Sequence, residues 1–160
     1  MRLVQRNYWL TLALTGLIVS LPIAHAQPSP DADKVEQAKI SLEAAAALAA
    51  GSPNAFPAHP ALSDSFGSAA KLQAARWWMI SFSIGWCREY SDLQMINALN
   101  VSLARALPNL GAAGLSRIRQ AGMRFRQQGA SLPLPGTTRD EQAEYCLVEL
   151  QAAREVLAEL

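Results

Sequence analysis

The chain has 160 residues, of which 51% are hydrophobic and 17% are charged, and its formal net charge is +1. This length is typical of one domain with a sizeable core. A charge so close to zero does not suit a protein that binds nucleic acid through a broad basic surface, so we expect no nucleic-acid partner.

Residues 1–26 have the features of a signal peptide. Arg2 and Arg6 form a basic opening, an apolar run follows from Tyr8 to Leu21, and Ala24 to Ala26 provide a cleavage site with small residues at its first and third positions. The alternative is an uncleaved membrane anchor, but the apolar run is shorter than the ~20 residues that a bilayer needs. The residue directly after the cleavage site is not a cysteine, which argues against a lipoprotein. We therefore expect export to the periplasm or the medium of a bacterium.

Residues 27–160 are expected to form a single helical-bundle domain. Loss of Arg2 and Arg6 with the leader changes the net charge from +1 to −1. Cys87 and Cys146 then remain in an oxidising compartment, which predicts a disulfide rather than a metal site or a nucleophile. Closing a loop of about 60 residues stabilises a fold by about 4 kcal/mol on the chain-entropy model.

Proline, glycine and capping residues divide the mature chain into helical segments, which predicts an all-α bundle of four to five helices. Ser29 is expected to cap the first helix. Capping-box patterns place further helix starts at Ser91 and Thr138. The expected helices cover residues 31–50, 68 to about 91, 92–107, 115–128 and 138–160, with a proline-rich loop at 52–60.

Residues 74–90 hold five of the nine aromatic side chains that follow the leader. Their alternation also fits a strand, but the flanking segments are strong helix formers and a lone strand would lack a partner, so we predict a helix. At about 100° per residue this helix has two apolar faces, one with Ile80, Ile84 and Cys87 and one with Trp78, Phe82 and Trp86.

The face of Trp78, Phe82 and Trp86 allows two interpretations. These side chains either belong to the core or line a groove for an apolar ligand or a partner protein. We expect them to be mostly buried within the monomer, covered by the helices at 31–50 and 92–107.

Charge is distributed unevenly along the chain. Residues 93–139 hold six arginines and no acid, whereas residues 140–160 hold six acids and one arginine. One explanation is that the basic helix packs beside the acidic one. Most acids of the last helix project away from Cys146, so Glu149 is the best-placed partner in that arrangement.

The helix at 115–128 combines an apolar stripe with arginines on both of its borders. These are Arg117 and Arg124 on one border and Arg119 and Arg126 on the other. The helix is either a solvated core helix, whose arginine stems lie on apolar surface, or an interfacial helix whose guanidinium groups reach phosphate. Of the two candidate surfaces, we expect the arginines to be the binding surface.

Few residues suggest chemistry. His59 is the one histidine that follows the leader, and no other ligand stands at metal-binding spacing, so we expect no metal site. The sequence has no GxSxG elbow and no glycine-rich phosphate loop, and we expect neither catalytic residues nor a cofactor. Glu89 and Asp92 are three residues apart and serve either as charges at a helix boundary or as the carboxylate pair of a hydrolase.

These observations favour a non-enzymatic binding protein of the bacterial envelope. Its expected partner is an envelope protein or an anionic component such as phospholipid head groups or lipopolysaccharide phosphate. The alternative is a small cell-wall hydrolase that uses Glu89 and Asp92. The sequence leaves the oligomeric state open.

Overall fold

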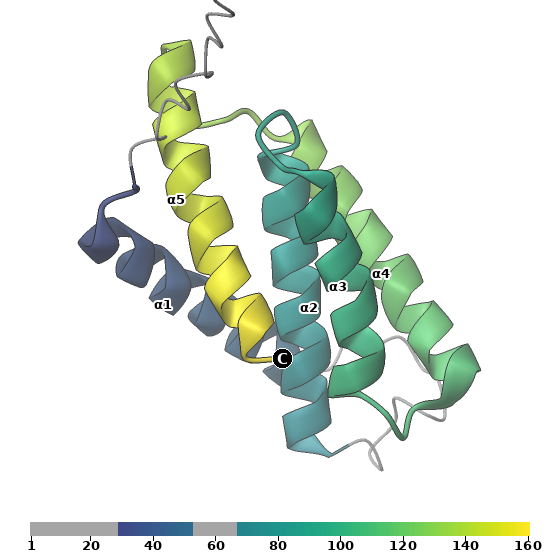
Figure 1. The fold of residues 1–160 in the computed structure, drawn as a ribbon. Coiled ribbons are helices and arrows are strands. Elements are labelled where there is room, and N and C mark those ends of the chain that lie inside the picture. Colours follow the sequence, from purple (N-terminus) through teal and green to yellow (C-terminus); the bar gives the residue numbers. More distant parts are fainter. Residues whose placement is uncertain (1–28, 53–66) are drawn as a thin grey trace, which may run out of the picture.

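The computed structural model describes residues 29–52 and 67–160, which form five helices and no strand (Figure 1). This confirms the predicted all-α class for that part of the chain. The predicted leader, most of the predicted loop at 52–60, and His59 lie outside the described residues. The helices are α1 (Ala32–Gly51), α2 (Ser68–Trp86), α3 (Leu93–Ala106), α4 (Gly111–Ser131) and α5 (Arg139–Ala158).

Two predicted helix caps are wrong by one or two residues. The cap of α1 is Asp31 rather than Ser29, and its carboxylate accepts a hydrogen bond from the N–H of Asp33 at 3.0 Å. The cap of α3 is Asp92 rather than Ser91, because the Asp92 carboxylate accepts the N–H of Met95 at 2.7 Å. In both cases an aspartate nearer to the helix replaces the predicted serine, and a carboxylate is also favoured by the helix dipole.

The predicted capping box of the last helix is confirmed. The Thr138 hydroxyl accepts the N–H of Glu141, and the Glu141 carboxylate accepts the N–H groups of Thr137 and Thr138. These bonds lower the pKa of Glu141. The start of α5 is therefore fixed by local hydrogen bonds.

α4 is longer than the predicted helix at 115–128. It begins at Gly111 and continues to Ser131. Gly111 has a φ of 70°, which glycine adopts at no steric cost. Among the described helices, α2 is its one extensive neighbour. Most of the surface of α4 that does not face α2 is therefore free of contact with the other described helices.

α2 occupies the centre of the bundle, with α1, α3, α4 and α5 packed around it (Figure 1). Its Trp78, Ile80 and Ile84 are completely buried. Each of these side chains contributes about 1.5 to 3 kcal/mol of burial free energy. This central position agrees with the two apolar faces that the sequence predicts for this helix.

Glycines bring the backbones of α2 and α4 close together. A side chain at Gly85 of α2 would overlap the backbone of Arg126, and one at Gly129 of α4 would overlap the carbonyl group of Phe82. A side chain at Gly122 would enter the ring of Trp77. The absence of a Cβ atom at these three positions is what permits this close contact.

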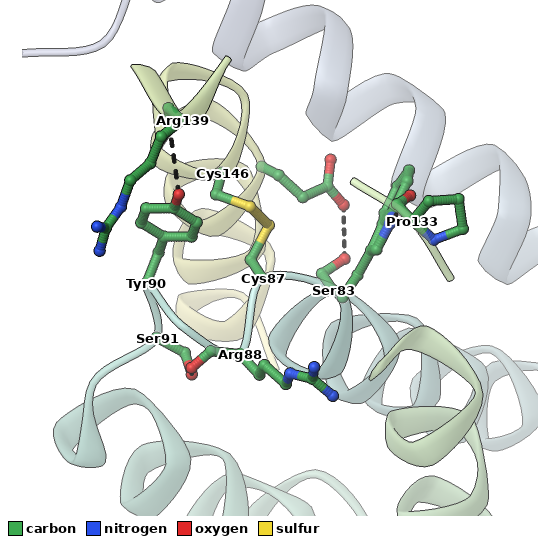
Figure 2. The surroundings of a disulfide bond; sticks show 10 residues. Ser83, Cys87, Arg88, Tyr90, Ser91, Pro133, Arg139 and Cys146 are labelled. Carbon is green, nitrogen blue, oxygen red and sulfur yellow. Dashed lines mark hydrogen bonds between the residues drawn. A yellow bond between two sulfur atoms is a disulfide. The ribbon is translucent and has the colours of Figure 1, made fainter. Parts of the chain in front are cut away.

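The predicted disulfide is confirmed. Cys87, at the C-terminal end of α2, is bonded to Cys146 in α5, with 5.5 Å between the Cα atoms and a sequence separation of 59 (Figure 2). Both side chains are completely buried. The bond joins the central helix to the last one.

Candidate functional site

Trp78 is a core residue, as predicted. It is completely buried, its indole N–H donates to the carbonyl oxygen of Ile118 at 3.1 Å, and its ring stacks on Phe125 at a centroid distance of 5.6 Å. Both partners belong to α4, a helix that the sequence did not predict as a cover of this side chain. The helix at 92–107 instead receives Trp77, whose indole N–H donates to Leu99 at 2.7 Å.

Phe82 and Trp86 lie on the same side of α2 and are mostly buried, as predicted, but neither is completely buried. Trp86 donates its indole N–H to the carbonyl oxygen of Pro133 at 3.0 Å and contacts the rings of Phe82 and Tyr145 at 5.7 and 5.2 Å. Both side chains also line a cavity that α1 borders.

Phe82 and Trp86 line a cavity of about 420 Å³ between α1, α2, α4 and α5. We call this cavity the aromatic groove, and its volume is typical of small-molecule sites. α1 contributes Leu42 and three small side chains to its wall, and the other helices contribute rings, a thioether and polar groups. The groove is lined by Ala38, Ser41, Leu42, Ala45, Met79, Phe82, Ser83, Trp86, Phe125, Gln128, Tyr145 and Glu149.

The aromatic groove contains one carboxylate, Glu149. The Ser83 hydroxyl donates a hydrogen bond to its Oε1 atom at 2.6 Å. Burial raises the pKa of Glu149, and the bond from Ser83 opposes that shift only in part. Burial, with a smaller contribution from the Glu149 charge, also raises the pKa of the neighbouring Tyr145.

Glu149 was interpreted from the sequence only as an ion-pair partner for the basic helix, and that interpretation is wrong. It forms no ion pair within the described residues, and it faces Ser83 of α2. The sequence did contain a signal for its position. Glu149 stands three residues after Cys146, which places it on the same side of α5 as the disulfide.

A second cavity of about 710 Å³ adjoins the aromatic groove and shares Ala38, Ser41, Tyr145 and Glu149 with it. Its outer part includes Lys34 and Glu144, which form an exposed ion pair of 2.7 Å between α1 and α5. The two cavities therefore share lining residues from α1 and α5.

The arginines of α4 form the second candidate site. Arg117, Arg119 and Arg124 are exposed and Arg126 is half-buried. None of the four forms an ion pair within residues 29–52 and 67–160. They lie on both flanks of the face that packs on α2, which is the arrangement that the sequence predicts.

The explanation that the basic helix packs beside the acidic one is wrong. α4 and α5 are not extensive neighbours, and the acids of α5 pair elsewhere. Glu144 and Glu159 pair with Lys34 and Lys39 of α1, each at 2.7 Å. The arginines of α4 thus have no acidic partner in the described part of the fold.

Asp92 and Glu89 do not have the features of a catalytic pair. Asp92 lines a cavity of about 550 Å³ between α3 and α5, but it caps α3 and pairs with Arg154 at 2.9 Å. The bond from the N–H of Met95, and to a smaller extent Arg154, lower the pKa of Asp92. A carboxyl group that acts as general acid needs a raised pKa instead. Glu89 is exposed in the turn after α2.

The described residues contain no group of three or more side chains that could hold a metal ion. No helix in the same part of the chain is both long and apolar enough to cross a bilayer. Comparison of the chain with protein-family models, with curated proteins and with solved structures found no match.

Proposed function

We propose that this protein is an exported, non-enzymatic binding protein that contacts the phosphate groups of anionic envelope lipids through α4. The observation that carries the proposal is the set of four arginines on α4 that have no acidic partner in the described residues. Guanidinium groups bind phosphate in a bidentate manner and are weakly hydrated, so they suit this contact.

The position of α4 in the bundle supports the proposal. α4 is held by close packing on α2 alone, so its outward surface is rigid and open to a large partner. Met123 is 57% exposed on the outward side and offers an apolar group between the arginine flanks. A basic side chain near an anionic membrane surface contributes about 1 kcal/mol of binding free energy.

Vesicle binding tests the proposal. The exported protein should co-sediment with phosphatidylcholine vesicles that contain 30% phosphatidylglycerol and not with phosphatidylcholine alone. Removal of two charges in the variant Arg119→Gln/Arg126→Gln should weaken binding about tenfold or more at low salt, because each charge contributes about 1 kcal/mol. The loss should shrink as ionic strength rises.

The matched control is Arg105→Gln/Arg139→Gln, which removes two exposed arginines outside α4. It should bind the anionic vesicles almost as well as the unchanged protein. Equal losses in both double variants would show that net charge, rather than α4, decides binding. If the unchanged protein binds no vesicles, lipid is not the partner, and the arginines instead contact another partner, such as an acidic envelope protein.

Export is part of the proposal and rests on the leader-like residues 1–26. The mature chain should begin at Gln27. The intact mass of protein recovered from the cell envelope measures this, and a mass that includes residues 1–26 would contradict it.

A further inference from the structure

The aromatic groove is a cavity that belongs neither to the packed core nor to the arginine surface proposed for lipid binding. Its wall contains the rings of Phe82, Trp86, Phe125 and Tyr145 together with the thioether of Met79. No arginine or lysine lines it. Rings of this kind present electron-rich faces to whatever occupies the groove, and such faces attract organic cations.

Glu149 gives the aromatic groove a carboxyl group in a fixed place. Its hydrogen bond to Ser83 spans from α5 to α2 beside the disulfide, so two rigid helices hold the carboxylate. It has no cationic partner among the described residues. Burial of a carboxylate without such a partner costs free energy, which an incoming cation would recover.

We propose that the aromatic groove binds an apolar organic cation, an ammonium group carried on a hydrocarbon or aromatic body. The ammonium group would lie between Glu149 and the rings of Trp86 and Tyr145. The apolar body would lie against Phe82 and the small side chains of α1.

The surroundings of the groove favour a cation over an anion or a neutral molecule. The adjoining cavity adds Glu141 and Glu144 and a single base, Lys34, so the lining of the two cavities together carries three acids against one base. Glu141 is engaged in the cap of α5 and Glu144 in the pair with Lys34, so Glu149 is the carboxylate left for the ligand. The volumes of about 420 and 710 Å³ accommodate an aromatic or alkyl body.

Titration with benzyltrimethylammonium tests this proposal. The exported, disulfide-bonded protein should bind this cation with a change in tryptophan fluorescence and a measurable heat. It should bind 3-phenylpropanoate, an anion with the same ring, at least tenfold more weakly. Equal binding of the two probes, or binding of neither, would overturn the proposal.

The variant Glu149→Gln separates charge from shape. It keeps the size of the side chain and its capacity to accept from Ser83, and it should weaken binding of the cation at least tenfold. The matched control is Glu155→Gln, which changes an acid on the same helix outside the groove. Unchanged affinity in Glu149→Gln, or an equal loss in Glu155→Gln, would rule out Glu149 as the anionic contact.

A second variant tests the rings. Phe82→Leu keeps an apolar side chain at a half-buried position but removes one π face, and it should weaken cation binding while the helical circular dichroism stays unchanged. Vesicle binding through α4 should be unaffected by Glu149→Gln and Phe82→Leu. The two proposed sites can therefore fail or succeed independently.

Discussion

α1 and α4 both pack against α2, but they do so in different ways. α4 approaches through glycines that bring backbones into contact, and it forms no ion pair within the described residues. α1 is joined to its neighbours by three ion pairs and leaves space beside α5. These pairs are Lys34 with Glu144, Lys39 with Glu159, and Glu43 with Arg76.

The close contact between α4 and α2 contributes stability, whereas the surroundings of α1 contain cavities. Close packing of apolar groups and backbone gains dispersion energy and removes apolar surface from water. An exposed ion pair such as Lys34 with Glu144 contributes only about 0 to 1 kcal/mol. Cavities can therefore persist beside α1.

The largest effect is expected at Trp78. Trp78→Ala removes a completely buried ring that stacks on Phe125 of α4, and it should lower the free energy of unfolding by about 3 to 5 kcal/mol. Trp86→Ala should cost clearly less, because Trp86 is half-buried beside the aromatic groove. Urea denaturation of both variants measures the difference. Equal losses would mean that the groove is as tightly packed as the contact with α4.

The disulfide joins α2, on which both α1 and α4 pack, to α5. Replacement of Cys87 and Cys146 by alanine should lower the free energy of unfolding by up to about 4 kcal/mol, because the bond closes a loop with a sequence separation of 59. Denaturation of the double variant beside the oxidised protein measures this loss. Thiol titration of the unreduced, denatured protein should find no free thiol. A double variant as stable as the oxidised protein would contradict the expected constraint on the unfolded chain.

An added methyl group tests the close contact directly. Gly85→Ala places a Cβ atom on the backbone of Arg126 and should cost about 1 to 3 kcal/mol, because α4 must move away. Gly51→Ala is the control, since a Cβ atom there meets nothing within 4 Å. The control should shift stability by no more than about 1 kcal/mol, in the stabilising direction. Melting temperatures of the two variants distinguish them, and similar values would show that α2 and α4 are less closely packed than the structure describes.

The smallest expected effect is the contribution of Glu149 to the pH dependence of stability. Burial raises its folded-state pKa, so the ionised group destabilises the fold at pH values above that pKa, and this penalty disappears below about pH 4, where both states are protonated. α1, α2 and α4 present no titratable side chain to the aromatic groove, and α5 adds only Tyr145. Glu149→Gln should therefore be at least as stable as the unchanged protein at pH 8, with the difference vanishing near pH 4.

Urea denaturation at the two pH values measures this, with Glu155→Gln as the control. Asp92, Glu141 and Glu159 act in the opposite direction. All three have lowered pKa values, so the stability that they contribute is lost as pH falls through those values. A comparison at each pH between the variant and the unchanged protein removes this shared background. A variant less stable than the unchanged protein at pH 8 would show that the ionised carboxylate supports the fold.

Much of the fold could be predicted from local signals. Helical periodicity, proline and glycine breakers and the Thr138 capping box are properties of short segments, and the disulfide followed from an even number of cysteines in a chain with a leader-like start. The caps at Asp31 and Asp92 were assigned to nearby serines, which compete for the same role, although Asp92 was also interpreted as a charge at a helix boundary. Their energies differ too little for sequence alone to decide.

The neighbours of each helix were harder to predict. Gly122 and Gly129 stand seven residues apart on one side of α4, which was an available signal for close contact with another helix, but nothing local identified α2 as that helix. The aromatic groove depends on where α1 lies relative to Phe82 and Trp86. The position of α1 is a property of the tertiary structure. Helical periodicity therefore identified the two rings but could not show that they remain partly exposed.

The position of the disulfide has a consequence for motion. The covalent loop between Cys87 and Cys146 contains α3 and α4, whereas α1 lies outside it. α1 can detach without extending that loop, so its opening should require less free energy than global unfolding, and its amide hydrogens should exchange faster than those of α2 and α5. The same local opening would uncover one wall of the aromatic groove, which gives a ligand a way in that leaves the remaining four helices folded.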